Sequence, residues 1–236
     1  MITLVVRDVQ PATPRANLVH VELGNHAFEY TAGQAVLIAP HGQQPRWPYS
    51  IASAPEDAKR SGIIDLLVGL DPVANGAQGA PAPAAGDSIE VEGPFGSFTF
   101  PEEPIERRFL FIAGGTGIAP LRSMLRHALG MPHDRIGLFY SARAADEFAF
   151  GEEFRALAAA GAIEFRQTVT RDGGAPWSGA RGRLTIDSLR ELIAGDDTLC
   201  FVCGPVSMVD DVPRVLQQAG ISRERIRIEE WQPHDG

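Results

Sequence analysis

The sequence has few of the residues that build metal centres, disulfide frameworks or membrane spans. Its 236 residues include two cysteines and six histidines. Two thiols are too few for a disulfide framework or a four-thiolate iron–sulfur cluster, and no two histidines stand four apart as zinc ligands on one helix would. No apolar run approaches the ~18 residues of a membrane span. A G-x-S-x-G elbow is also missing, which leaves hydrolase chemistry little support.

Positive charge is also scarce, since the formal net charge is -9. A protein that binds nucleic-acid backbones would need a basic face, so we expect no nucleic-acid partner. Arginines cluster at 106–108 and 223–227; we interpret them as solvated surface that can also meet small anions or an acidic partner. The first ten residues predict a strand and not a secretory signal. We therefore expect a cytoplasmic protein without membrane insertion.

The two cysteines, Cys200 and Cys203, have C-x-x-C spacing. Such spacing occurs in redox dithiols, but the surrounding "TLCFVCGP" predicts a buried strand. Residues three apart on a strand point to opposite faces. A dithiol would need a break in that strand, so the pattern favours two separate buried thiols.

The first half of the chain predicts an antiparallel barrel or sandwich, because short β-type segments follow one another without helical periods. These segments are residues 2–9, 17–23, 35–40, 49–54, 62–70 and 88–93. Residues 71–87 are almost all Ala, Gly and Pro and predict a long irregular connection.

The second half alternates apolar strands with helical periods, which predicts a parallel sheet covered on both faces. The expected strands are 108–114, 135–142, 163–170, 198–204 and 225–231, and the expected helices are 118–130, 152–161, 185–195 and 206–220. The predicted architecture is a β-barrel domain over 1–103 followed by an α/β domain over 104–236.

Three turns carry residues suited to ligand binding. "IAGGTGIAP" (112–120) joins a strand to a helix, and Gly114, Gly115 and Gly117 leave backbone amides open to phosphate oxygens. "VCGPVSM" (202–208) ends a later strand and is expected to share the same crevice. Cys203 would lie at the edge of this crevice. There it would either contact the ring of a ligand or be an ordinary buried residue just before a turn. "EGPFGSF" (92–98) predicts a rigid turn with free amides.

Taken together, these stretches resemble the ferredoxin–NADP reductase family. The matching motifs are "PYSIAS", "GPFGSF", "GGTGIAP", Thr170-Arg171, "CGPVSM" and an acid-x-aromatic triplet, in the order and spacing of that family. The resemblance covers nearly the whole chain. It implies a flavin-binding antiparallel barrel, a nicotinamide-binding α/β domain, and hydride transfer from the nicotinamide to flavin N5 between them.

The resemblance also implies roles for individual residues. Tyr49 would lie against the isoalloxazine ring, and the Ser50 hydroxyl would hydrogen-bond near flavin N5. Cys203 would touch the nicotinamide, with Glu229 as the terminal acid. The implied catalytic residues are therefore Ser50, Cys203 and Glu229. The implied flavin-binding residues are Arg46, Trp47, Pro48, Tyr49, Ser50, Gly93, Pro94, Phe95, Gly96 and Ser97.

For the nicotinamide dinucleotide, the resemblance places Gly115, Thr116 and Gly117 at the pyrophosphate. Thr170 and Arg171 fall where NADPH-using relatives bind the 2′-phosphate, which favours NADPH slightly over NADH. The implied nicotinamide-side residues are Gly114, Gly115, Thr116, Gly117, Thr170, Arg171, Cys203, Gly204, Pro205 and Met208, with Trp231 stacking on a ring. Five residues follow Trp231, which makes its stacking role less secure.

The chain departs from the family on the flavin-phosphate side. The family has R-x-Y-S, but Trp47 stands at the Arg position and Arg46 is one residue earlier. A one-residue offset on a strand turns the side chain to the other face. Gly79 stands where a Ser or Thr usually caps a flavin phosphate. The expected cofactor is FAD, either weakly held or replaced by FMN.

Three functions fit these residues. The first is a flavin-dependent NAD(P)H oxidoreductase that passes electrons to a separate ferredoxin, flavodoxin or oxygenase component. The second is an NAD(P)H:flavin reductase that releases its flavin. The loss of expected flavin-phosphate contacts at Trp47 and Gly79 favours this function, whereas the intact "GPFGSF" motif argues against it. The third is an electron-transfer or regulatory subunit that is inactive without its partner.

Overall fold

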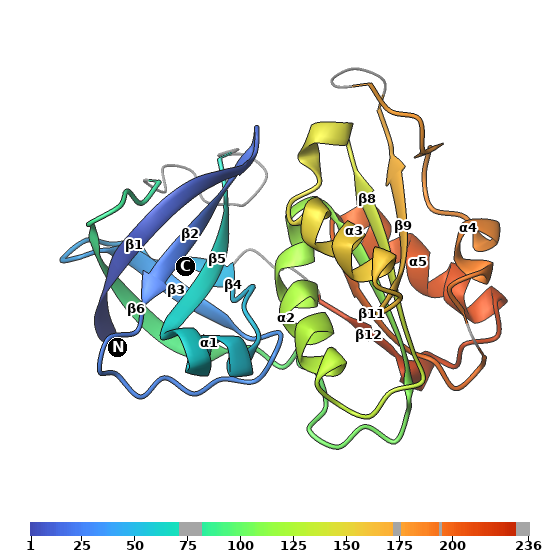
Figure 1. Ribbon diagram of the computed structural model, residues 1–236, viewed down its shortest axis with the longest axis horizontal. Helices are drawn as coiled ribbons and strands as arrows, with labels where there is room; N and C mark the ends of the chain where they lie inside the picture. The colour runs from blue at the N-terminus through green and yellow to red at the C-terminus, as the bar shows by residue number, and fades with distance from the viewer. Residues whose placement is uncertain (71–81, 172–175, 194, 230–236) are drawn as a thin grey trace.

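The computed structural model describes residues 1–70, 82–171, 176–193 and 195–229 and folds them around two six-stranded sheets (Figure 1). The elements of the first sheet region are β1 (Ile2–Thr13), β2 (Ala16–Glu22), β3 (Ala35–Pro40), β4 (Trp47–Ser50), α1 (Pro55–Ser61), β5 (Ile63–Gly69) and β6 (Ser88–Phe95). Those of the second are β7 (Arg108–Gly114), α2 (Ile118–Leu129), β8 (Arg135–Ala142), α3 (Gly151–Ala159), β9 (Glu164–Val169), β10 (Ala180–Arg181), α4 (Ile186–Arg190), β11 (Leu199–Cys203), α5 (Val206–Gln218) and β12 (Ile226–Ile228).

The first sheet is antiparallel, with strand order β4-β3-β6-β1-β2-β5. A bridge between Ile51 and Leu66 joins its two edges and closes a barrel. Alternate residues of the strands face inward and form one apolar cluster that includes Val6, Val21 and Ile38. The predicted antiparallel barrel is confirmed.

The barrel region contains a helix that the sequence prediction missed. Helix α1 begins with Pro55 in its first turn, carries Glu56 and Asp57 near its start, and ends at Gly62 with φ 71°. Proline and acids at a helix start and a left-handed glycine at its end are standard signals. They were obscured because seven residues are too few for a clear amphipathic period. The expected strand over 49–54 accordingly ends at Ser50.

The second sheet is parallel throughout, with strand order β10-β9-β8-β7-β11-β12. Two apolar clusters pack on its faces. One includes Ile118 and Leu121 of α2 with Phe154 of α3, and the other includes Leu189 of α4 and Leu216 of α5. The predicted parallel sheet with helices on both faces is confirmed.

Strand β11 shows the alternation that the C-x-x-C spacing predicted. Cys200 packs in the cluster under α4 and α5, whereas Cys203 packs in the cluster under α2. Both thiols are free and buried. Burial raises the pKa of Cys200 to about 12, so this thiol is protonated and inert at neutral pH.

The two sheets are joined by an apolar interface under α2, which lies between them in Figure 1. Phe100, from the segment after β6, packs against Phe109 with ring centroids 4.9 Å apart and stacks on Phe201 at 5.4 Å. Gly33 of the barrel lies so close to α2 that an added Cβ would stand 2.2 Å from Met124 Cε. Residues 96–107 connect the sheets, and the predicted domain boundary after residue 103 falls in this connection.

Candidate functional site

Two glycine-containing turns meet at the carboxyl edge of the parallel sheet, one after β7 and one after β11. A Cβ added to Gly117 would lie 2.5 Å from the Cys203 carbonyl oxygen, and one added to Gly114 would lie 2.6 Å from Pro205 Cδ. These glycines are therefore needed for the close approach of the two turns. Gly115, with φ +55°, instead faces open space and leaves its backbone accessible. The turns were expected to share one crevice, and the structure brings them into contact.

Cys203, which is buried, pairs with the partly buried Glu229 beside these turns. Its Sγ lies 2.8 Å from Glu229 Oε2, and the thiol is the donor. Burial, together with the Glu229 charge, raises the pKa of Cys203 well above its ordinary value. Burial also raises the pKa of Glu229, although the hydrogen bond from Cys203 opposes that shift. The pair therefore holds protons more tightly than the same groups would in water.

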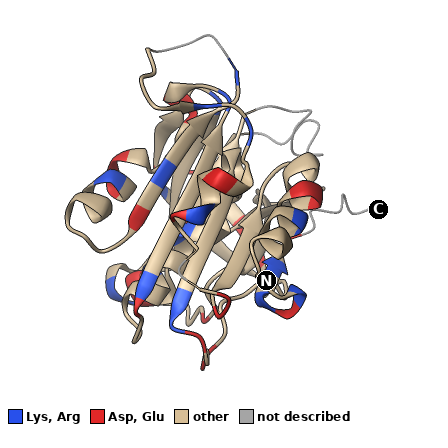
Figure 2. Ribbon diagram, turned by 90° about the vertical axis from the view of Figure 1, so that its right-hand side faces the viewer, with Lys and Arg blue, Asp and Glu red and all other residues tan. Residues whose placement is uncertain are grey.

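Thr170 and Arg171 follow β9 at the same edge of the sheet and are exposed. The Thr170 hydroxyl donates to the Ala142 carbonyl at 3.2 Å, and the Arg171 amide donates to the Arg143 carbonyl at 3.0 Å. Arg143 is a residue that the sequence reasoning missed, although it follows β8 as Arg171 follows β9. Within the described part of the chain, neither the Arg143 nor the Arg171 guanidinium forms an ion pair. Figure 2 shows blue arginine segments at this end of the α/β half and others at the opposite end.

On the barrel, a partly open row runs across three strands. Ser50 of β4 pairs with Ala35 of β3, which in turn pairs with Phe95 of β6. Directly opposed residues share one face of an antiparallel sheet. Phe95 is 44% exposed, and the side chain between it and Ser50 is a small alanine. The row therefore offers a flat surface bounded by a hydroxyl and an aromatic ring.

The turn after this row is built around Gly93 and Gly96. Both have positive φ, +136° and +102°, and an added Cβ at Gly96 would meet nothing within 4 Å. Pro94 is partly buried, whereas Gly96 and Ser97 are exposed. The turn thus presents open backbone beside the row, as the sequence predicts for a ligand-binding turn.

Tyr49 and Trp47 lie on the opposite face of β4, toward the barrel interior. Tyr49 pairs with Val36 and Trp47 with Ile38, both inward-facing core residues. Tyr49 is only 8% exposed, and burial raises the pKa of its hydroxyl. Both aromatic rings line a small, open hollow that has Asp87 on its wall.

Arg46 forms ion pairs with two carboxylates of β6. Its Nη2 lies 2.8 Å from Glu90 Oε2, and its Nη1 lies 3.6 Å from Glu92 Oε2. The hydrogen bond from Arg46 lowers the pKa of Glu90, which keeps that acid ionised. With its charge already balanced by two acids, Arg46 is poorly placed to bind phosphate. The described barrel residues therefore fit the ring of a flavin better than its phosphates.

Two residues named from the sequence lie outside the described residues, namely Trp231 and Gly79. Among the described residues, no group of His, Cys, Asp and Glu is arranged to hold a metal ion. None of the described helices is both long and apolar enough to cross a membrane.

The chain is similar to known oxidoreductases over almost its whole length. Residues 111–214 match the family of the oxidoreductase NAD-binding domain. The chain is 33% identical to ferredoxin–NADP reductase B of Sorangium cellulosum, and the match covers 94% of each protein. It is 27% identical to oxidoreductase NAD-binding domain-containing protein 1 of Danio rerio, over 96% of this chain and 90% of that protein.

Solved structures show the same arrangement. The cytochrome P450 reductase GcoB of Amycolatopsis superposes with a TM-score of 0.82 and 26% identity, over 97% of this chain and 68% of that one. A ferredoxin–NADP+ reductase of Neisseria gonorrhoeae, solved with bound FAD and NADP, superposes with a TM-score of 0.79 and 20% identity, over 97% of each chain.

Proposed function

The chain belongs to the ferredoxin–NADP reductase family, and from that premise we propose that it oxidises NAD(P)H and passes the electrons through a flavin to a separate acceptor protein. The observation that carries this proposal is the contact between the two glycine-containing turns, with the Cys203–Glu229 pair beside them. Glycine amides at a helix start suit a pyrophosphate, and a small buried thiol leaves room for a nicotinamide ring.

On the nicotinamide side, Gly114, Gly115, Thr116 and Gly117 would receive the pyrophosphate at the start of α2. Thr170, Arg171 and the neighbouring Arg143 would bind the 2′-phosphate, which favours NADPH because guanidinium groups form strong charge-assisted hydrogen bonds with phosphate. Gly204, Pro205 and Met208 would form the opposite wall of the crevice.

Beside the nicotinamide, the Cys203 thiol donates to Glu229 and is uncharged at neutral pH because its pKa is raised. An uncharged sulfur next to the ring would add no charge of its own, so the charge nearest to a bound nicotinamide on this side would be that of the Glu229 carboxylate. Glu229 would then hold or release a proton at Oε2.

On the flavin side, the row of Ser50, Ala35 and Phe95 would receive the isoalloxazine ring, with the Ser50 hydroxyl near N5. A bound flavin supplies a two-electron hydride acceptor that can release its electrons singly. Gly93, Pro94, Gly96 and Ser97 would border the ring. Tyr49 would support this wall from the barrel side, since its 8% exposure leaves little ring face for stacking.

The acceptor would be a separate polypeptide or oxygenase component. The chain has two cysteines, which cannot ligate an iron–sulfur cluster of four thiolates. One similar structure is a cytochrome P450 reductase, and one similar sequence is a ferredoxin–NADP reductase. A ferredoxin, a flavodoxin or an oxygenase subunit would therefore complete the reaction.

A second candidate function is favoured by the pairing of Arg46 with Glu90 and Glu92. With that cation neutralised, the barrel holds a flavin mainly through its ring. A flavin held in this way exchanges readily, so the chain would act as an NAD(P)H:flavin reductase with flavin as a released substrate.

Purification followed by anaerobic assay separates these functions. The experiment records the visible spectrum of the purified protein, then NADPH and NADH oxidation with added FAD, FMN or riboflavin. A yellow protein that retains about one flavin per chain supports the first function, and a colourless one that turns over added flavin supports the second. If neither nucleotide is oxidised with any flavin, the chain is not an autonomous reductase and is instead a subunit or binding module.

A further inference from the structure

The segment that directly follows Ser50 is held by an arginine from the other half of the molecule. Arg122 Nη1, from α2, donates to the Ala52 carbonyl at 2.9 Å and to Asp65 Oδ2 of β5 at 3.0 Å. The Arg122 side chain is 11% exposed and that of Asp65 is 17% exposed. One largely buried guanidinium therefore joins α2 to a backbone carbonyl and to a side-chain carboxylate of the barrel.

The next residue of this segment is fixed as well. The Ser53 carbonyl accepts hydrogen bonds from Ser123 Oγ of α2 at 2.7 Å and from the Tyr30 hydroxyl at 3.0 Å. Ser53 Oγ in turn accepts from the Asp65 amide at 3.1 Å. Ser53 is 3% exposed. Consecutive carbonyls are thus bound by consecutive α2 side chains, which leaves the segment little freedom to slide along the helix.

The other side of Arg122 is anchored within the α/β half. Its Nε donates to Glu153 Oε2 of α3 at 2.8 Å, and its guanidinium lies 4.3 Å from the centroid of the Phe150 ring. Phe150, which precedes α3, has φ 58°, a left-handed conformation unfavourable for an aromatic residue. The surrounding contacts hold Phe150 in that conformation, and it gives Arg122 a fixed support.

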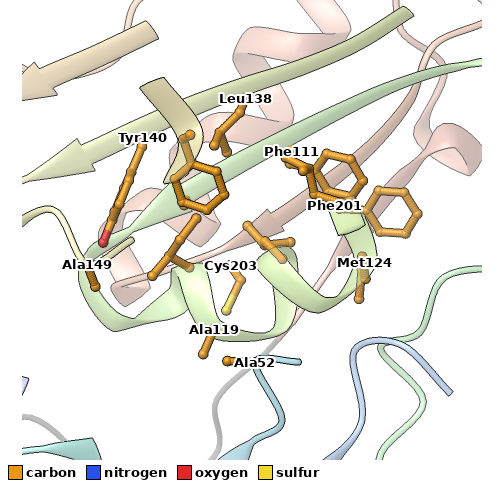
Figure 3. Packing of buried hydrophobic residues seen from close by; sticks show 14 of the residues in the cluster. Ala52, Phe111, Ala119, Met124, Leu138, Tyr140, Ala149, Phe201 and Cys203 are labelled. Carbon is orange, nitrogen blue, oxygen red and sulfur yellow. The ribbon is translucent and has the colours of Figure 1, made fainter. Parts of the chain in front are cut away.

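Helix α2 connects these contacts to the nicotinamide side. It begins at Ile118, directly after the glycine turn of 115–117. Arg122 therefore lies about 7 Å along the helix axis from that turn, at ~1.5 Å per residue. Figure 3 shows Ala52 next to Ala119 of α2, with Cys203 close by, and all three belong to one apolar cluster.

We propose that Arg122 is a positioning residue that sets the distance and angle between the flavin wall at Ser50 and the nicotinamide turn at 115–117. This inference rests on the proposed function. Hydride transfer requires the reacting atoms to approach to about 3–3.5 Å, and a misplacement of ~1 Å costs about 100-fold in rate. Arg122 ties the wall and the turn together two residues after Ser50 and five residues after Gly117.

The test compares Arg122→Met with Arg126→Met. Arg126 lies one turn later on α2 and pairs with Asp57 of α1 and Glu153 of α3. It crosses the same interface, but among the described residues its hydrogen bonds go to Asp57 and Glu153 and not to residues 52–53. Flavin reduction by NADPH is followed in single turnover, which separates the hydride-transfer rate from the NADPH dissociation constant. Arg122→Lys keeps the charge and serves if Arg122→Met does not fold.

We expect Arg122→Met to slow hydride transfer by about 10- to 100-fold, with the NADPH dissociation constant changed by less than about threefold. Arg122→Lys should be intermediate, because an ammonium cannot present the planar donor set that reaches Ala52, Asp65 and Glu153 together. Arg126→Met should keep the wild-type rate. Equal rates in Arg122→Met and wild type, or equal losses in Arg122→Met and Arg126→Met, would overturn the inference.

A second measurement needs no flavin. The Ala52 amide donates to the Asp65 carbonyl at 2.8 Å, so hydrogen exchange at 51–54 reports how firmly this segment is held. Arg122→Met should speed exchange there in flavin-free protein, and Arg126→Met should not. Unchanged exchange in Arg122→Met would contradict the inference. A wild-type protein that reduces no flavin would instead overturn the proposed function, which keeps the two failures distinct.

Discussion

The two halves of the candidate site differ in how completely their residues suit a cofactor. At the parallel sheet, two glycine-containing turns touch, a buried thiol meets a partly buried carboxyl, and Arg143 and Arg171 are neighbours joined by a backbone hydrogen bond. On the barrel, the Ser50 row is partly open, but Arg46 is paired with two acids. The crevice at the parallel sheet, where we propose that the nicotinamide binds, is therefore the more complete of the two.

The difference shows that membership of a family does not fix every contact of that family. At the parallel sheet, the two glycine-containing turns are positioned by close backbone contacts. An added side chain at Gly114 or Gly117 would disrupt these contacts, so few substitutions are tolerated there. The family resemblance implies that a single arginine of the barrel meets the flavin phosphate, and in this chain Trp47 stands at that position. In a barrel arranged like this one, a flavin would be held by its ring and would exchange more readily.

The largest effect is expected from Gly117→Ala. The added Cβ would lie 2.5 Å from the Cys203 carbonyl oxygen and 2.8 Å from the Gly204 amide nitrogen, so the two turns must separate. We expect a loss of stability of roughly 1–3 kcal/mol and at least about tenfold weaker NADPH binding, measured by urea denaturation and by titration. Gly130→Ala is the control, since its nearest contact is 3.4 Å from the His127 carbonyl oxygen. Equal free energies of unfolding for the two variants would contradict the close contact between the turns after β7 and β11.

Arg171→Ala should have the next largest effect, and on one nucleotide only. Loss of a charge-assisted phosphate contact corresponds to ~1.5–3 kcal/mol, or roughly tenfold or more in the NADPH dissociation constant. NADH binding should change by less than about twofold, because NADH has no 2′-phosphate. Arg166→Ala, on β9 just before Arg171 but paired with Glu191, is the control. Equal weakening of both nucleotides would remove Arg171 from phosphate recognition.

How much of this site the sequence predicts depends on how far apart in the sequence the interacting residues are. The turns at 112–120 and 202–208 are local features, since strand, glycine and helix follow one another within nine residues. Their meeting at one edge follows from the parallel sheet, and this was foreseen. The opposite faces of Cys200 and Cys203 followed from strand alternation in the same way.

Contacts between residues distant in sequence could not be predicted in this way. Arg46 and Glu90 are separated by 44 positions, and the registers of β4 with β3 and of β3 with β6 bring them together. Arg122 and Asp65 are separated by 57 positions and meet across the two halves. Arg143 was the exception, because its place after a predicted strand was a signal available in the sequence.

A smaller effect is expected when the two acids that hold Arg46 are neutralised. Glu90→Gln with Glu92→Gln would release the guanidinium, so FAD and FMN should bind about three- to tenfold more tightly, the range of one exposed charge contact. Riboflavin, which has no phosphate, should bind as before. Glu152→Gln, a fully exposed acid on α3, is the control for net charge. Unchanged FAD affinity would mean that these acids do not limit the phosphate side.

The smallest effect concerns stability and pH. The folded pKa of Glu229 is raised above its ordinary 4.5, so the folded state binds this proton more tightly than the unfolded state. The resulting stabilisation is complete below pH 4.5 and is lost as pH rises through the folded pKa. Glu229→Gln cannot ionise, so its stability relative to wild type should increase from pH 4 toward neutrality. Urea denaturation at several pH values measures this, and a constant difference would contradict the raised pKa.

The most direct test of the proposed function is an anaerobic titration of the protein, supplied with FAD, with NADPH. The flavin absorbance reports each hydride transferred. The structure predicts that the absorbance falls in proportion to the NADPH added, until about one equivalent per bound flavin has been consumed. An absorbance that does not change with NADPH or with NADH would contradict the assignment of the crevice beside Cys203 as a nicotinamide site.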